Sequence, residues 1–247
     1  MAQNADTGGV TAYRAALPMY DPAELRSETD AHWRAIRAAV PDDLNVAFER
    51  PATAADMYEL LADQQLLLSQ TCWGPMSLGL NPDLEVIAQP DFSAFEGGIG
   101  PLYRSVVVGL SPSQNCPVPR DERANLAHVP PNRRLGFNDR ASLSGYLCLD
   151  RDLPGGFDPT LETGSHRDSL LAVADGLVDI AAIDCRTWAQ LQRIEPAAGE
   201  VRILGWTKAR TGLPYVCSPK LPEALKHAVQ DALLAQGAHP PSLSPIL

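Results

Sequence analysis

Residues 138–146 read Asn-Asp-Arg-Ala-Ser-Leu-Ser-Gly-Tyr. This stretch follows an apolar strand pattern at residues 135–137 and has the polar turn that precedes a helix. A helix N-terminus leaves about four N–H groups without partners inside the helix and carries about half a positive charge. Ser142 and Ser144 stand where hydroxyls can join those groups around one small anion, and Gly145 lets a ligand approach the backbone closely.

The same residues are also typical of plain helix capping, because Ser, Asp and Asn are the commonest N-cap residues. A second stretch, Thr163-Gly164-Ser165-His166, repeats the design and favours two anion-binding turns. His166 is then a ligand contact, through a hydrogen bond when neutral and through its charge when protonated. The alternative for His166 is an exposed side chain near an N-cap.

Composition limits the kind of protein. Of the 247 residues, 45% are hydrophobic and 20% are charged, which predicts an ordinary globular core. The net charge is −10 and no Lys/Arg cluster appears, so no nucleic-acid partner is expected. No run approaches the roughly 20 apolar residues of a membrane span. The chain has neither G-x-G-x-x-G nor G-K-[ST], and no cofactor is expected.

Five cysteines, Cys72, Cys116, Cys148, Cys185 and Cys217, stand singly in the sequence. This spacing argues against a disulfide framework and against a structural zinc site, so no metal is expected. Cys148 and Cys185 lie in apolar runs and are predicted core residues. Three interpretations of Cys72 remain: a packed thiol, a ligand-lining residue or a nucleophile. No base lies near it in the sequence, and no catalytic residue is assigned.

Strand and helix patterns alternate along the chain, which predicts an α/β fold with mostly parallel sheets. Strands are expected at 10–18, 44–49, 66–70, 84–89, 103–110, 134–137, 161–164, 178–183 and 201–207. Helices are expected at 23–39, 56–62, 144–149, 165–175, 187–193 and 222–236. Loops or turns are expected at 111–125, 151–159 and 210–214.

Polar and aromatic residues gather where the predicted strands end, which is where open α/β sheets bind ligands. They are Tyr20, Trp73, residues 142–146, Ser165, His166 and Asp184. Two interpretations of Asp184 remain: it caps the following helix, or it faces the ligand. The aromatic side chains are either core residues or ligand contacts.

Six stretches in one collinear order carry a resemblance to a known family. They are Met19-Tyr20-Asp21, residues 67–75 with Gln-Thr-Cys, Tyr103-Arg104-Ser105-Val106-Val107-Val108, residues 138–146, Thr163-Gly164-Ser165-His166, and residues 176–185. Together they resemble the PhnD-like substrate-binding proteins of ABC transporters for phosphonate, phosphite or phosphate. The resemblance covers about residues 15 to 218.

The resemblance implies a type II periplasmic-binding-protein fold, with two α/β lobes joined by two crossover strands and a ligand cleft between them. The crossovers are expected near 101–104 and 204–208. Lobe 1 is then residues 1–102 with 207–247, and lobe 2 is residues 103–206. The implied anion site is Ser142, Leu143, Ser144 and His166. Tyr20, Trp73 and Tyr103 are the implied aromatic contacts, and Asp184 would face a ligand amine.

The implied function is non-catalytic capture of a small phosphorus oxyanion for ABC-type transport, with an ABC permease as partner. The alternative is a cytoplasmic enzyme or a ligand sensor on the same scaffold. The N-terminus shows no secretory signal pattern. The expected location is therefore periplasmic if a signal peptide has been removed, and cytoplasmic if the given N-terminus is native.

Overall fold

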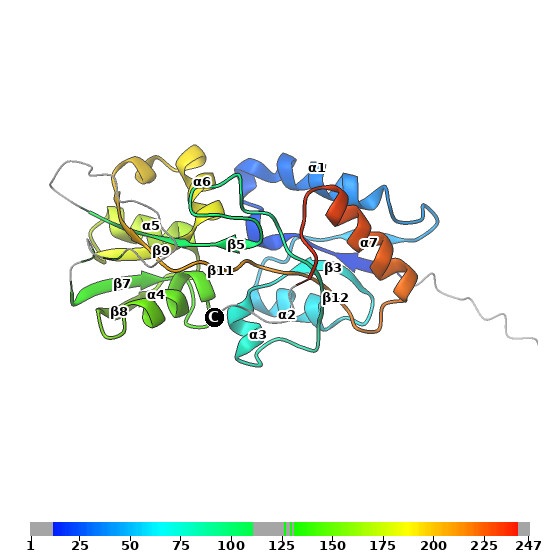
Figure 1. The fold of residues 1–247 in the computed structure, drawn as a ribbon, viewed down its shortest axis with the longest axis horizontal. Coiled ribbons are helices and arrows are strands. Elements are labelled where there is room, and N and C mark those ends of the chain that lie inside the picture. The colour runs from blue at the N-terminus through cyan, green and yellow to red at the C-terminus, as the bar shows by residue number, and fades with distance from the viewer. Residues whose placement is uncertain (1–11, 111–125, 127–128, 130, 242–247) are drawn as a thin grey trace, which may run out of the picture.

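The computed structural model describes residues 12–110, 126, 129 and 131–241 of the chain. It consists of two α/β bodies side by side, with strands β5 (Leu102–Tyr103) and β11 (Arg210–Thr211) running between them (Figure 1). These two strands pair antiparallel, Tyr103 opposite Arg210. The predicted two-lobed fold with two crossover strands is confirmed.

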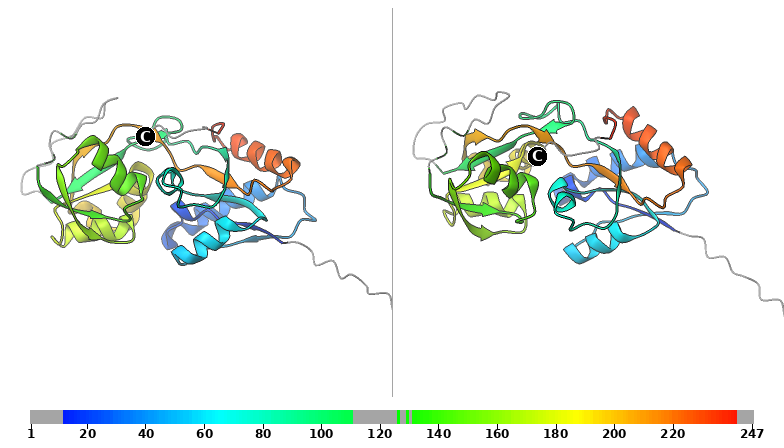
Figure 2. Two further views of the ribbon diagram at one scale, coloured as in Figure 1. Left: turned by 90° about the horizontal axis from the view of Figure 1, so that it is seen from below. Right: turned by 60° about the horizontal axis from the view of Figure 1, so that its bottom comes forward.

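The first lobe is built on a five-stranded sheet in the order β2-β1-β3-β12-β4. Its strands are β1 (Tyr13–Ala15), β2 (Val46–Phe48), β3 (Leu66–Gln70), β4 (Glu85–Ala88) and β12 (Tyr215–Cys217). Helices α1 (Arg26–Arg37) and α7 (Glu223–Ala235) pack together on one face. Helix α2 (Ala54–Ala62) covers the other face, and α3 (Trp73–Ser77) follows β3 towards the second lobe (Figure 2).

The second lobe has a five-stranded sheet in the order β10-β6-β9-β7-β8. Its strands are β6 (Ser105–Gly109), β7 (Arg133–Phe137), β8 (Phe157–Glu162), β9 (Ile180–Asp184) and β10 (Arg202–Trp206). Helices α5 (His166–Ala174) and α6 (Cys185–Ile194) cover one face. The other face is covered by the π-helix η3 (Leu143–Leu147) and its continuation α4 (Cys148–Asp152). Short 3-10 helices occupy Pro18–Tyr20 (η1), Ala23–Leu25 (η2) and Pro196–Gly199 (η4).

Local sequence explains where the main helices lie. In α1, Trp33 and Ile36 recur at helical spacing and are buried against α7 and the sheet. Helix α2 begins with a capping box between Thr53 and Asp56. Helix α5 ends before Gly176, whose φ of 71° is strained for residues with a side chain. None of the described helices is long and apolar enough to cross a membrane.

The expectation of mostly parallel sheets is wrong, because both sheets are mixed. Strand β12 runs antiparallel to β3 and β4, and β6 runs antiparallel to β9 and β10. These strands are the ones that directly continue the two crossovers. A chain that enters a lobe from its neighbour lacks the helical connection that makes consecutive strands parallel.

Several predicted element boundaries also change. The predicted loop 151–159 contains the start of β8, in which Pro159 is tolerated because β8 is an edge strand. The predicted turn 210–214 contains β11, and α6 begins at Cys185 rather than residue 187. The predicted helix 144–149 is η3 followed by α4, which reaches Asp152. The predicted loop 111–125 lies outside the described residues.

Candidate functional site

Three helices begin at one edge of the second sheet. Strand β7 runs parallel to β8 and β9, so the carboxyl ends of all three strands meet at this edge. Helices η3, α5 and α6 follow these strands, with Ser142, Ser165 and Asp184 as their N-cap residues. The positive ends of three helix dipoles therefore converge on one place.

All three N-cap side chains do cap their helices. The Ser142 hydroxyl accepts from Gly145 N at 3.1 Å, and the Ser165 hydroxyl accepts from Asp168 N at 3.0 Å. Asp184 Oδ1 accepts from Arg186 N at 3.1 Å and Thr187 N at 3.0 Å. The carboxylate of Asp184 offsets the positive end of α6. Helix η3 has a neutral cap and no acidic residue in its first turn, so it keeps its positive end.

Ser144, His166 and Asp184 come together in front of these helix ends. Ser144 Oγ lies 2.9 Å from His166 Nε2, and Asp184 Oδ2 lies 3.5 Å from the same nitrogen. Ser142 Oγ lies 3.5 Å from Ser144 Oγ. The His166 side chain is 12% exposed and that of Asp184 is 3% exposed. The two predicted anion-binding turns thus form one buried polar cluster.

The cluster contains Ser, His and Asp but not in the arrangement of a hydrolase triad. In a triad, the carboxylate holds one imidazole nitrogen so that the other can take the proton of the serine. Here Ser144 and Asp184 both meet Nε2. The geometry suits hydrogen bonding to a bound anion better than activation of Ser144.

Burial lowers the pKa of His166 below its ordinary value of 6.5, against the opposing effects of the Asp184 carboxylate and the Ala182 carbonyl. The imidazole is therefore neutral near pH 7 in this structure. His32, on α1, also has a pKa lowered by burial, although its hydrogen bond to Gln236 opposes this.

These two histidines predict a pH dependence of stability. Their pKa values are lower in the folded chain than in the unfolded chain, so the unfolded chain binds more protons around and below pH 6.5. The free energy of unfolding is therefore expected to fall as the pH drops below about 6.5, by at most about 1.4 kcal/mol per pH unit for each group. Urea unfolding of the ligand-free protein at pH 7.5, 6.5 and 5.5 measures it. His166→Gln should reduce the slope and leave the share of His32, and an unchanged slope would contradict a neutral buried His166.

The aromatic residues of the predicted site are all buried. Tyr20 lies edge-on to Phe92 with ring centroids 6.4 Å apart, and Phe92 lies 5.6 Å from Tyr103. Burial, followed by the Asp184 charge, raises the pKa of Tyr20 well above 10. Its hydroxyl is buried without a hydrogen-bond partner among the described residues, as is Trp73 Nε1. Two buried donors without partners are what a polar ligand would satisfy.

The corner between β3 and α3 sits directly on the start of η3. Leu143 N donates to Cys72 Sγ at 3.4 Å, and Trp73 packs on Leu143 and Cys148. A Cβ on Gly74 would lie 1.9 Å from Ala141 O and 2.8 Å from Leu143 N. Burial raises the pKa of Cys72, so its thiol is poorly suited to be a nucleophile. Of the interpretations left open for Cys72, a packed thiol describes its environment best.

Further contacts join the two bodies around the cluster. Gln190 donates to Tyr20 O at 3.1 Å, and the Arg186 guanidinium lies 4.2 Å from the Tyr20 ring centroid. Arg167 pairs with Glu24 at 2.9 Å, and Arg193 pairs with Glu28. The two lobes are therefore in contact, and the Ser144–His166–Asp184 cluster lies between them.

Sequence reasoning missed two residues of this region. Asn138 Oδ1 is buried without a partner among the described residues, and a Cβ on Gly145 would lie 1.9 Å from it. Gly145 thus allows Asn138 and η3 to lie close together, and its contact with a ligand stays a prediction. Asn138 is the first residue of the 138–146 stretch. Its position directly after a predicted strand was the available signal for a role in the site. Nothing in the sequence around Gly74 shows its contact with the other lobe.

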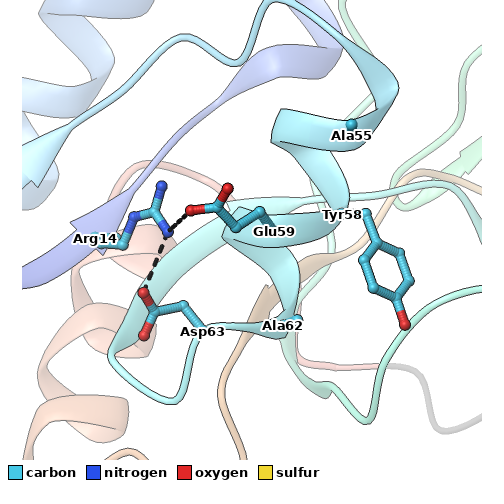
Figure 3. A pocket seen from close by; sticks show the side chains of 6 residues that line it. All are labelled: Arg14, Ala55, Tyr58, Glu59, Ala62 and Asp63. Atoms are coloured by element: carbon cyan, nitrogen blue, oxygen red, sulfur yellow. Dashed lines mark hydrogen bonds and ion pairs between the residues drawn. The ribbon is translucent and has the colours of Figure 1, made fainter.

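A hollow of about 660 Å³ lies away from the polar cluster, on α2 of the first lobe (Figure 3). The Arg14 side chain in its wall pairs with Asp63 at 3.2 Å and with Glu59 at 3.6 Å. It shares no residue with the Ser144–His166–Asp184 cluster and lies on the outside of α2. Its one cationic side chain, Arg14, is already held by the Glu59 and Asp63 carboxylates, so we do not assign the hollow a ligand. Within the described part of the chain, no group of three His, Cys, Asp or Glu residues could hold a metal ion.

The model of one protein family, the periplasmic substrate-binding proteins of ABC phosphonate transporters, matches residues 15–245. The chain belongs to this family. It is a family of substrate-binding transport proteins rather than of enzymes, and its members act in the periplasm as components of ABC importers. No curated protein matches the chain in sequence.

Solved structures agree with the fold at low sequence identity. The binding component of an ABC phosphonate transporter from Pseudomonas aeruginosa is 18% identical with a TM-score of 0.64, over 90% of this chain and 74% of that one. PhnD1 from Prochlorococcus marinus, in complex with methylphosphonate, is 15% identical with a TM-score of 0.67, over 91% and 84%. A histidine kinase sensor domain is 12% identical with a TM-score of 0.59, over 93% and 98%.

Proposed function

We propose that this substrate-binding protein captures a phosphonate, or a related phosphorus oxyanion, between its two lobes at Ser142, Leu143, Ser144, Gly145, Ser165 and His166. Tyr20, Trp73 and Tyr103 cover the ligand from the hinge and the first lobe. The lobes are residues 1–102 with 207–247, and residues 103–206. An ABC permease receives the ligand in the periplasmic role of the family.

The observation that carries this proposal is the buried contact between Ser144 and His166 at the start of η3, the helix that keeps its positive end. Hydrogen bonds to a charged acceptor are about twice as strong as those between neutral groups. Hydroxyls, N–H groups and an imidazole can therefore hold an anion without a lysine or arginine. The buried donors Tyr20 Oη and Trp73 Nε1 support a polar ligand at this place.

Thermal unfolding with added anions tests the proposal. At about 100 times its dissociation constant, a ligand adds about 2.7 kcal/mol to the free energy of unfolding, which raises the melting temperature by several degrees. We expect this shift with methylphosphonate, phosphite or phosphate, and none with sulfate at the same concentration. Ser144→Ala and His166→Ala should abolish it. Ser144 is a better choice than Ser142 because it does not cap η3.

The matched control is His227→Ala, which removes an exposed imidazole on α7 of the first lobe. It should keep the full shift. If none of the phosphorus oxyanions stabilises the wild-type protein, the proposed ligand class is wrong. If His227→Ala and His166→Ala respond alike, the site is misplaced.

A further inference from the structure

A groove beside His166 adjoins the proposed anion site. It has a volume of about 280 Å³ and is lined from both lobes, by Pro18, Met19 and Pro22 on one side and by Leu191 and Ile194 of α6 on the other. His166 and Ser165 belong to its wall as well as to the anion-binding turns. The groove therefore continues directly from the proposed anion site.

The charged groups of this groove are already paired. Arg167 binds Glu24 at 2.9 Å and Glu195 at 2.8 Å. Asp21 Oδ2 binds Arg50 at 2.7 Å, which offsets the carboxylate charge, while Asp21 Oδ1 is buried without a hydrogen-bond partner among the described residues. The amide nitrogen of Gln190 is taken by Tyr20 O. What remains on the wall is mainly apolar. Pockets for drug-sized ligands have about 300–1,000 Å³, so a groove of this size fits a small group.

Asp184, the residue expected to face a ligand amine, is occupied by the protein itself. Its Oδ1 holds the first N–H groups of α6, and its Oδ2 lies beside His166 Nε2. Its side chain is 3% exposed. An ammonium group on the ligand would have to be buried here, and a buried charge without a dedicated partner is costly.

We propose that the groove receives the organic substituent of a phosphonate, and that this substituent is a short, uncharged alkyl chain rather than an aminoalkyl chain. This inference rests on the proposed function. The phosphonate group lies at Ser144 and His166, and the chain passes His166 into the groove between Met19 and Ile194. The groove is formed by both lobes, so a chain lying in it contacts both lobes.

Calorimetric titration with methyl-, propyl- and 2-aminoethylphosphonate tests this, because the last two have chains of equal length. Each buried methylene should tighten binding about fourfold. Propylphosphonate should therefore bind about 15-fold more tightly than methylphosphonate, and at least tenfold more tightly than 2-aminoethylphosphonate. Equal affinity for methyl- and propylphosphonate, or a preference for 2-aminoethylphosphonate, would overturn the inference. If methylphosphonate itself does not bind, the proposed function fails first.

A charge placed in the groove gives a second test. Met19→Glu should remove the gain of the propyl chain over methylphosphonate and improve the binding of 2-aminoethylphosphonate relative to propylphosphonate. Leu177→Glu adds the same charge at a position that is 58% exposed and outside the groove, and it should change none of the three affinities. An unchanged preference in a folded Met19→Glu variant would show that the chain does not lie in this groove.

Discussion

Replacing Asp152 with Ala is expected to lower the free energy of unfolding by about 3–5 kcal/mol, because it leaves the buried guanidinium of Arg210 without its partner. Arg210 and Asp152 form two hydrogen bonds, at 2.8 and 2.9 Å, and their side chains are 4% and 1% exposed. Asp152 also accepts from Lys208 N at 2.7 Å. The pair fastens the end of α4 to the second crossover.

Burial alone would raise the pKa of Asp152, but the hydrogen bonds from Arg210 and Lys208 N outweigh it and lower the pKa. The carboxylate is therefore charged in the folded protein at neutral pH. Urea unfolding at pH 7 measures the loss. Glu28→Ala is the control, since its ion pair with Arg193 is 54% exposed on both sides and solvent screens it. Losses of equal size in the two variants would contradict the role given to the buried pair.

Gly74→Ala is expected to weaken ligand binding on the order of 100-fold, equivalent to about 2.7 kcal/mol. The new Cβ would lie 1.9 Å from Ala141 O, whereas ordinary contact begins at 3.4 Å. The lobes would have to part there by the difference, 3.4 − 1.9 = 1.5 Å, which is enough to break hydrogen bonds that both lobes make to one ligand. Alanine favours a helix over glycine, so α3 itself should not suffer.

Calorimetry with methylphosphonate measures this loss, and small-angle X-ray scattering should show a larger radius of gyration with ligand present than for the wild type. The control is Gly199→Ala, because that added Cβ meets nothing within 4 Å and Gly199 is exposed. Its affinity should equal that of the wild type. If Gly74→Ala binds normally, the contact between Gly74 and Ala141 does not limit closure.

The sequence predicted the parts of the fold that depend on local pattern. The apolar run at β3, the periodic apolar residues of α1 and the glycine after α5 each specify their element without help from elsewhere. The directions of β12 and β6 were not predictable in this way. The direction of each of these strands depends on which lobe the chain has just left. The residue pattern within a strand does not indicate this.

The candidate site was predicted in its composition but not in its contacts. The turns at Ser142 and Ser165 could be placed at one sheet edge because parallel strands end together. That Asp184 and Ser144 share one nitrogen of His166 depends on side-chain positions in three separate turns. The contacts of Cys72 and Gly74 with η3 arise only when two lobes meet, and residues about 70 positions apart gave no local signal of it.

The position of Cys72 also makes its thiol a natural reporter of lobe motion. While the lobes are together, its sulfur lies against Leu143 N and its pKa is raised, so alkylating reagents react with it slowly. When the lobes part, the same sulfur meets water. Cys185 and Cys217 are buried, whereas Cys148 packs on Trp73 across the contact between the lobes. In a background with Cys116→Ser and Cys148→Ser, the rate of alkylation at Cys72 therefore reports how often the lobes separate. A ligand that holds the lobes together would lower the rate of alkylation at Cys72. Lobe opening could therefore be followed without attaching a dye or label beforehand.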